Sequence, residues 1–138
     1  MADDLLAQRR AKLERLREQG IDPFPHSFAG VEPVAAVRAA HAGLEPGAET
    51  ESRHRLAGRL HARRGQGGMA FLDLDDRSGR IQLQAKRDVL GSERMDLLLE
   101  LDLGDIVGID GVAFMSKRGE LTIRVEDFTV LAKSLRPP

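Results

Sequence analysis

Hydrophobic and polar residues alternate with period two through most of the chain after residue 53. Because successive side chains of a strand point to opposite faces, this alternation predicts strands with one buried and one solvated face. Four such alternating segments can be placed, over residues 53–64, 69–75, 80–85 and 120–130. A phase break at Asp127 indicates a bulge in the last of them. A further strand, over residues 106–115, is apolar on both faces and is therefore predicted to be buried or bulged. Between the third alternating segment and this strand, Asp88 or Ser92 can cap a helix that continues through a run of leucines to Leu101.

The order of three strands, a helix and two strands is that of the OB-fold, a five-stranded Greek-key barrel whose second and third strands face the ligand. We therefore predict a mainly β fold with added α-helices, and a barrel domain over residues 51–132. Residues 1–50 are predicted to form a helical extension and linker, with one helix ending at Gly20 and a second over Pro33–Ala42. Residues 133–138 are interpreted as a linker to a further domain.

Phe71 lies on the polar face of its predicted strand. In the segment 69–75 the alternation buries Ala70, Leu72 and Leu74 and leaves Phe71 on the outer face. The chain has five Phe and no Trp or Tyr, so a scarce ring is placed on a solvated surface. Exposed rings on basic sheets stack on nucleobases. The alternative is that this ring folds over and packs under the N-terminal helix.

The net charge of -1 hides a basic segment. Residues 53–64 hold five arginines and no acidic residue, and such a segment can bind a polyanion locally. An arginine-rich strand face is, however, more often simply solvated. The absence of cysteine excludes thiol catalysis and Cys-ligated zinc and indicates a reducing compartment. The N-terminus has no apolar signal core, so we expect a cytoplasmic protein that does not associate with membranes.

The outward positions of the predicted strands would form one polar surface suited to single-stranded RNA. Arginines would hold phosphates, a ring would stack on a base, and an amide would read the edge of that base. A glutamine amide carries a donor beside an acceptor, which matches N3–H and the adjacent carbonyl of uracil. Gln82 alone is more often a solvated strand residue, and Glu120 could instead pair with Arg124 on its own strand. The candidate residues are Arg55, Arg59, His61, Arg63, Phe71, Gln82, Glu120 and Arg124.

Motifs for catalysis or metal binding are weak. Asp73, Asp75 and Asp76 do not have the spacing of a calcium loop, and the four histidines show no ligand spacing. The glycine-rich turn at residues 65–68 lacks the Lys-Ser/Thr pair and the helix of a phosphate loop. We therefore expect no catalytic site and no bound cofactor or metal in this chain.

Several segments resemble class II lysyl-tRNA synthetases. Residues 10–25, which read RAKLERLREQGIDPFP, are similar to the opening of that family, and so are residues 102–108 and 117–121. Residues 131–137 match the segment that leads into the family's catalytic domain. The resemblance covers essentially the whole chain. It implies that residues 51–132 form the anticodon-binding OB domain.

The resemblance also implies roles for individual residues. In this subgroup of synthetases a Phe of strand two stacks on the central anticodon uridine and a Gln of strand three reads its edge, which corresponds to Phe71 and Gln82 here. Arg63 and Arg64 match family positions that contact the anticodon loop, and Glu120 matches an acidic residue near the anticodon. One departure is that the family usually has a lysine just before the small residue and Phe, where this chain has Gly68.

The partner implied by the resemblance is the anticodon stem-loop of a lysine tRNA. The full-length parent would be a homodimer, and ATP and magnesium would belong to its catalytic domain, which would follow residue 138. Two competing interpretations stay open. The chain could be a general single-stranded nucleic-acid-binding OB module, or a protein-interaction appendage that stabilises a dimer.

Overall fold

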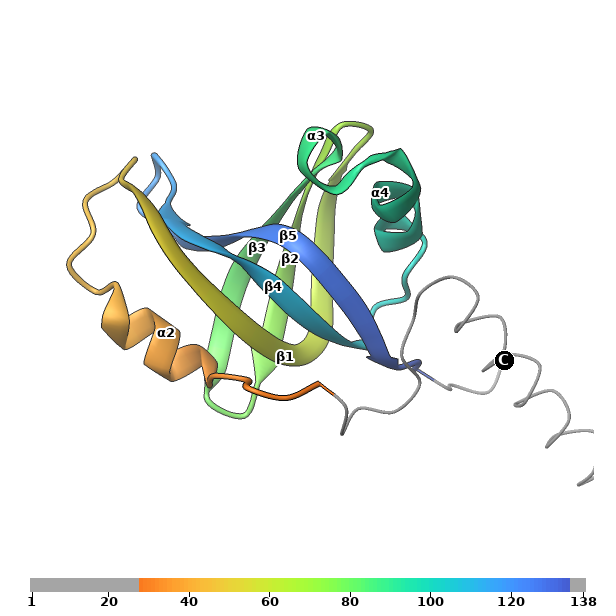
Figure 1. The fold of residues 1–138 in the computed structure, drawn as a ribbon, viewed down its shortest axis with the longest axis horizontal. Helices are drawn as coiled ribbons and strands as arrows, with labels where there is room; N and C mark the ends of the chain where they lie inside the picture. Colours follow the sequence, from red (N-terminus) through yellow and green to blue (C-terminus); the bar gives the residue numbers. More distant parts are fainter. Residues whose placement is uncertain (1–27, 135–138) are drawn as a thin grey trace, which may run out of the picture.

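A closed barrel of five strands makes up most of the computed structural model, which describes residues 28–134 (Figure 1). The strands are β1 (Glu49–Gln66), β2 (Met69–Asp76), β3 (Gly79–Lys86), β4 (Ile106–Met115) and β5 (Leu121–Ala132). Around the barrel they follow the order β1-β2-β3-β5-β4. The β3–β5 pair is parallel, whereas the other neighbouring pairs are antiparallel. The predicted OB-fold is therefore confirmed.

Three short helices accompany the barrel. They are α2 (Val34–Ala40), α3 (Arg87–Leu90) and α4 (Ser92–Leu99), and α2 lies on the side of the barrel away from α3 and α4 (Figure 1). The predicted helix between the third and fourth strands is confirmed, although Gly91 at φ 87° divides it in two. The predicted helix ending at Gly20 lies outside the described residues. Every helix within residues 28–134 is too short or too polar to span a bilayer.

The core lies inside the barrel and is formed by alternate residues of β2 and β3 and by less regularly spaced residues of β4 and β5. Two valines of α2, Val34 and Val37, are fully buried and belong to the same hydrophobic cluster, so this helix is an integral part of the fold. Burying one branched side chain contributes roughly 1.5–3 kcal/mol, which makes the barrel core the main source of stability. The largest fully buried side chains of the strands are Leu56, Leu60, Leu72, Leu74, Ile81, Leu83, Ile109, Ile123 and Phe128.

The long strand β1 belongs to both halves of the barrel. Its first part pairs with β4 and its last part pairs with β2, and Arg59 takes part in both ladders. Just before that point the β2 backbone lies very close to β1. A Cβ added to Gly58 would therefore press against the carbonyl group of Asp75. A glycine is therefore needed where β1 passes from one partner to the other.

Two of the bulges in the strands bear on the predicted alternation of β5 and β1. In β5, Glu126 is an extra residue between the pairs Asp110–Asp127 and Gly111–Val125, so the bulge indicated by the phase break is confirmed. In β1, His61 is an extra residue, because Leu60 pairs with Leu74 and Ala62 pairs with the preceding residue of β2. The predicted unbroken alternation of β1 is therefore wrong beyond Leu60. A bulge inserts one unpaired residue and reverses the faces of everything after it.

Candidate nucleic-acid interface

The β1 bulge decides which arginine lies beside Phe71. Arg64 is the partner of Phe71 in the ladder, so the two side chains share the outer face. Arg63 is the partner of the buried Leu72, and its Nη1 donates to the carbonyl oxygen of Leu101 at 2.6 Å. The prediction that Arg63 faces outward with Phe71 is therefore wrong. Arg64 takes the place that the unbroken alternation assigned to its neighbour.

The outer face of β2, β3 and β5 presents two rows of paired residues. In the first row Phe71 pairs with Gln84, which pairs with Arg124. In the second row, immediately beside it, Asp73 pairs with Gln82, which pairs with Thr122. Phe71 and Gln82 are thus diagonal neighbours on adjacent strands, within reach of each other for long side chains.

Phe71 and Gln82 line one surface hollow of about 440 Å³. The Phe71 ring is half-buried, which leaves part of it open to solvent. The rest of the wall comes from β1 and from the turn between β4 and β5, whose lysine and arginine are exposed. The seven lining residues are Arg64, Phe71, Gln82, Ser116, Lys117, Arg118 and Glu120. This hollow contains an aromatic ring, an amide and three cationic side chains, which are the groups that contact unpaired nucleotides.

A hydrogen-bonded network fixes the polar side chains of this hollow. Arg64 donates to both carboxylate oxygens of Asp73, at 3.0 and 3.3 Å, and to Oε1 of Gln82 at 3.1 Å. Gln82 Nε2 donates to Oγ1 of Thr122 at 3.0 Å. The hydrogen bond with Asp73 outweighs desolvation and raises the pKa of Arg64 above its ordinary value. The guanidinium therefore stays charged and is held in one place.

Glu120 lies on the rim of the hollow but pairs with a helix rather than with its own strand. Its Oε1 is 3.4 Å from Nη2 of Arg38 on α2, and both side chains are about half exposed. Arg124 instead pairs with Glu49 at 3.2 Å. The alternative in which Glu120 simply pairs with Arg124 is therefore wrong.

Besides Arg63, three of the predicted arginines lie away from the hollow. Arg55 donates to both oxygens of Asp110, at 2.7 and 3.1 Å, and its guanidinium stacks 4.3 Å from the ring centre of Phe28. Arg59 is exposed where β1 passes from β4 to β2. Arg124 lies in the same row as Phe71 but donates to Gln84 at 3.3 Å, and does not line the hollow. The single surface expected for all these residues is therefore divided.

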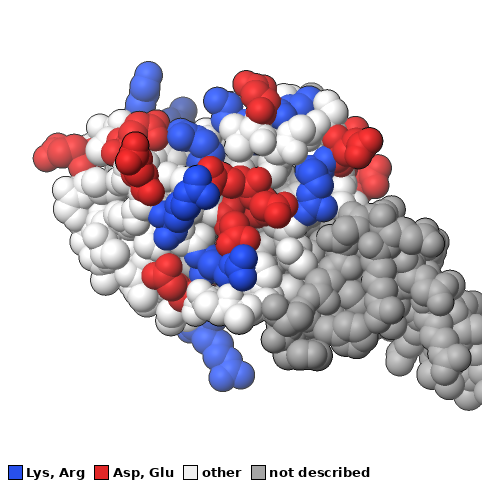
Figure 2. Space-filling view, in the orientation of Figure 1, with Lys and Arg blue, Asp and Glu red and all other residues white. Residues whose placement is uncertain are grey.

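The basic segment of β1 is matched by acidic residues of β4 and β5. Arg53 pairs with Glu126 at 3.3 Å, in addition to the Arg55–Asp110 pair. Figure 2 shows basic and acidic side chains intermingled over the visible face of the molecule. Paired opposite charges present little net field, so this part of β1 offers a polyanion less attraction than the sequence alone indicates.

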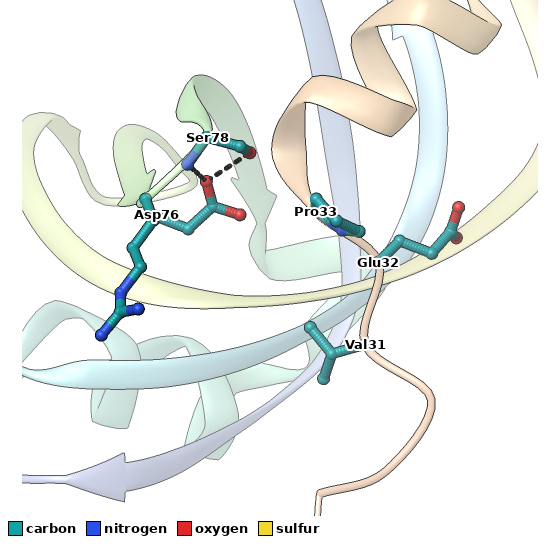
Figure 3. A pocket seen from close by; sticks show the side chains of 6 residues that line it. Val31, Glu32, Pro33, Asp76 and Ser78 are labelled. Carbon is teal, nitrogen blue, oxygen red and sulfur yellow. Dashed lines mark hydrogen bonds between the residues drawn. The ribbon is translucent and has the colours of Figure 1, made fainter.

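A second hollow lies between the start of α2 and the β2–β3 turn (Figure 3). Its volume is about 410 Å³, and its lining residues are Val31, Glu32, Pro33, Asp76, Arg77 and Ser78. The carboxylate of Asp76 already accepts the backbone N–H of Val34 at 2.9 Å and that of Ser78 at 2.7 Å. Its oxygens are therefore used to hold α2 against the turn, which is a structural task.

Sequence reasoning missed Gln84, Thr122 and the Lys117–Arg118 turn as parts of this surface. Gln84 follows the same alternation as Gln82 and could have been included on that ground. The other two join the surface only because β5 lies beside β3, a pairing of segments about 40 residues apart. Within residues 28–134, no three or more His, Cys, Asp or Glu side chains are grouped in a way that could hold a metal ion.

The fold agrees with a comparison against protein families. Residues 54–131 match the tRNA anti-codon family, described as an OB-fold nucleic acid binding domain. This match covers more than half of the chain, and the chain therefore belongs to that family of nucleic-acid-binding OB domains.

Curated relatives narrow the family further. The lysine–tRNA ligase of Halalkalibacterium halodurans is 39% identical over 137 residues, which is 98% of this chain and 27% of that protein. The lysine–tRNA ligase of Moorella thermoacetica is 43% identical over 135 residues, again 98% of this chain and 27% of the relative. That of Magnetococcus marinus is 39% identical over 134 residues, or 96% and 27%. The chain thus spans about a quarter of these relatives, and the resemblance to lysyl-tRNA synthetases is confirmed.

Proposed function

We propose that this chain binds the anticodon stem-loop of a lysine tRNA, with the central anticodon uridine stacked on Phe71 and its edge read by Gln82. The observation that carries this proposal is that both side chains line one hollow on the outer face of β2 and β3. A half-buried ring supported by its own sheet offers one free π-face to a base. The names of the relatives supply the identity of the tRNA.

Three cationic residues surround the proposed base site. Lys117 and Arg118 are exposed in the β4–β5 turn, and Arg64 stands on the β1 side. Arg64 is already neutralised by Asp73, so the turn residues would supply most of the attraction for phosphate groups. Such contacts give affinity that falls with salt, whereas the ring and the amide give base preference.

Aminoacylation is proposed only for a full-length protein. Because the chain spans about a quarter of its relatives, the module would present the tRNA to an ATP-dependent catalytic domain in such a protein. The predicted homodimer of that enzyme stays a prediction.

Titration of an RNA hairpin with a UUU anticodon loop tests the proposal, because stacking on one aromatic ring is worth about 1–3 kcal/mol per base. The Phe71→Ala variant should therefore bind roughly 5- to 150-fold more weakly than the parent chain. Phe28→Ala is the matched control, since Phe28 is also half-buried but stacks under Arg55 instead. Its affinity for the hairpin should be unchanged.

Two results would contradict the proposal. One is a Phe71→Ala variant that binds the UUU hairpin as tightly as the parent chain. The other is equal affinity of the parent chain for the hairpin and for oligo-dT, which would favour a general single-strand-binding module. Sedimentation at the same concentrations reports whether the chain instead self-associates, as expected for a dimer-stabilising appendage.

A further inference from the structure

The side-chain amide of Gln82 is hydrogen-bonded from both of its ends. Oε1 accepts from Nη2 of Arg64 at 3.1 Å, and Nε2 donates to Oγ1 of Thr122 at 3.0 Å. An amide has two acceptor lone pairs and two donor hydrogens. One lone pair and one N–H therefore remain for a ligand in the hollow that Gln82 lines.

Neither neighbour can exchange its role. The guanidinium of Arg64 has donors only, and Asp73 holds it with two hydrogen bonds. Thr122 has a single hydroxyl hydrogen, and it donates this hydrogen to the carbonyl oxygen of Glu120 at 3.0 Å. Towards Gln82 the threonine oxygen can therefore only accept. A reversed amide would face donor to donor at Arg64 and acceptor to acceptor at Thr122.

The direction of this amide decides which pyrimidine it matches. Uracil presents the N3–H donor beside a carbonyl acceptor, whereas cytosine presents an N3 acceptor beside an amino donor. At the N3 and C4 positions, donor and acceptor are exchanged between the two bases. An amide that is free to turn over can pair with either edge, so glutamine alone does not distinguish the two bases.

We propose that Thr122 and the Arg64–Asp73 pair are specificity-determining positioning residues, which lock the Gln82 amide in the one direction that accepts uridine and rejects cytidine. This inference rests on the proposed function, because it assumes that Gln82 reads a base in the hollow. It assigns the pyrimidine preference to a fully buried threonine of β5 and to a β1–β2 ion pair that need not touch the base. Both hydrogen bonds that set this direction are made within the free chain, so the locked direction does not depend on bound RNA.

The experiment compares two hairpins that differ only in U or C at the centre of the anticodon loop. The parent chain should prefer the uridine hairpin by about tenfold, the scale of one bidentate base contact. Thr122→Val keeps the shape of the side chain and removes the acceptor. The ratio of the affinity for the uridine hairpin to that for the cytidine hairpin should therefore fall below about threefold. Thr122→Ser restores the hydroxyl and should restore the ratio. Asp73→Ala should release Arg64, which holds the Oε1 end of the Gln82 amide. This variant should therefore also lower the ratio of uridine to cytidine affinity.

A second measurement does not depend on RNA. In the free parent chain one of the two side-chain N–H groups of Gln82 should be protected from hydrogen exchange, because it donates to Thr122. Thr122→Val should remove this protection, and Thr122→Ser should retain it. If Thr122→Val unfolds the chain, the ratio of uridine to cytidine affinity in Asp73→Ala still tests whether the Gln82 amide is held in one direction.

The outcomes separate this inference from the proposed function. If the parent chain binds both hairpins equally, the uridine-reading function fails and the inference fails with it. If the parent chain prefers uridine and both Thr122→Val and Asp73→Ala keep the full preference, only the positioning role is overturned. Loss of affinity for both hairpins with an unchanged ratio also overturns it, because it indicates a structural role.

Discussion

The Nε2 atoms of His41 and His54 lie 2.8 Å apart, and this contact ties the end of α2 to β1. His54 is almost fully buried, and its Nδ1 is 2.8 Å from Oε1 of Glu32, which accepts the hydrogen bond. Nε2 of His54 then accepts from the His41 ring and lies 3.0 Å from Oγ of Ser52. With one hydrogen between the two rings the contact is a hydrogen bond, and with two it is a clash between two donors.

The first prediction is that stability falls on acidification because of this pair. Burial lowers the pKa of His41 below its ordinary value of 6.5, the charge of His54 lowers it further, and Glu32 opposes both. Below pH 6.5 the unfolded chain therefore binds more protons than the folded chain, so the free energy of unfolding decreases as the pH falls. Urea unfolding followed from about pH 7 to about pH 5 should show a decreasing midpoint.

His41→Gln should flatten this pH dependence, since it removes the group whose pKa is lowered. His61→Gln is the control, because His61 is an exposed histidine of the β1 bulge. Its variant should keep the slope of the parent chain. An unchanged slope in His41→Gln would show that the histidine pair does not control the acid response.

The second prediction concerns Asp76, which caps α2 from the β2–β3 turn. Burial acts to raise its pKa, but hydrogen bonds from the Ser78 hydroxyl and from the backbone of Val34, Ser78 and Gly79 outweigh burial and lower it. Asp76→Ala should reduce the free energy of unfolding by about 2 kcal/mol, the upper range for loss of a helix cap. Arg77→Ala, an exposed neighbour in the same turn, should change it by less than about 0.5 kcal/mol. Urea unfolding near neutral pH measures both.

The lowered pKa of Asp76 gives a second test of whether its carboxylate charge holds α2. The stabilisation by Asp76 is present above its ordinary value of 3.8 and is lost as the pH falls below that value. The difference between the parent chain and Asp76→Ala should therefore shrink in acid. A difference that stays constant would mean that the carboxylate charge is not what holds α2.

The third prediction concerns a buried ion pair at the end of β5. Asp105 is fully buried, lies 2.5 Å from Nζ of Lys133, and accepts the backbone N–H of Ser134 at 2.7 Å. Lys133→Met should destabilise the chain by about 3 kcal/mol, because removing one partner leaves a buried carboxylate without its cation. Asp102→Asn should cost less than about 1 kcal/mol. Asp102 also pairs with Lys133, at 3.3 Å, but its side chain is largely exposed. Equal costs in the two variants would contradict this account.

The same residues mark where the sequence could and could not predict structure. Phe71 and Gln82 were placed correctly on the outer face because β2 and β3 pair residue for residue, without a bulge between them. Arg63 was placed wrongly because the segment around His61 alternates as a regular strand would. The extra residue is defined only by its pairing with β2, and composition carries no trace of that.

Contacts between segments that are distant in the sequence could not be predicted either. Thr122 becomes a neighbour of Gln82 because β5 closes the barrel in parallel beside β3. Nothing in the local alternation of either strand sets that register. The Asp105–Lys133 pair has the same origin, since it joins the start of β4 to the end of β5. Local patterns thus predicted most of the strands and the outward positions of Phe71 and Gln82, whereas the hydrogen bonds that join Gln82 to its neighbours depend on the closed barrel.

The fourth prediction concerns Gly68, where the resembling family usually has a lysine. Gly68 lies in the β1–β2 turn, its φ is not positive, and a Cβ added to it meets nothing within 4 Å. Gly68→Lys should therefore fold without strain and change stability by less than about 0.5 kcal/mol. If the turn lies along the RNA backbone, the variant should bind the UUU hairpin more tightly. The salt dependence of log affinity should also become steeper by about 0.7, the value for one added phosphate contact on a single strand.

Gly43→Lys is the matched control for this prediction. Gly43 follows α2, is equally open, and also has no positive φ, so the variant adds the same charge at a different place. It should leave the salt slope of hairpin binding almost unchanged. An equal gain in both variants would indicate attraction to net charge alone, and no gain in Gly68→Lys would place the RNA backbone away from the β1–β2 turn. A gain confined to Gly68→Lys would show that the RNA passes this turn on its way to the hollow at Phe71.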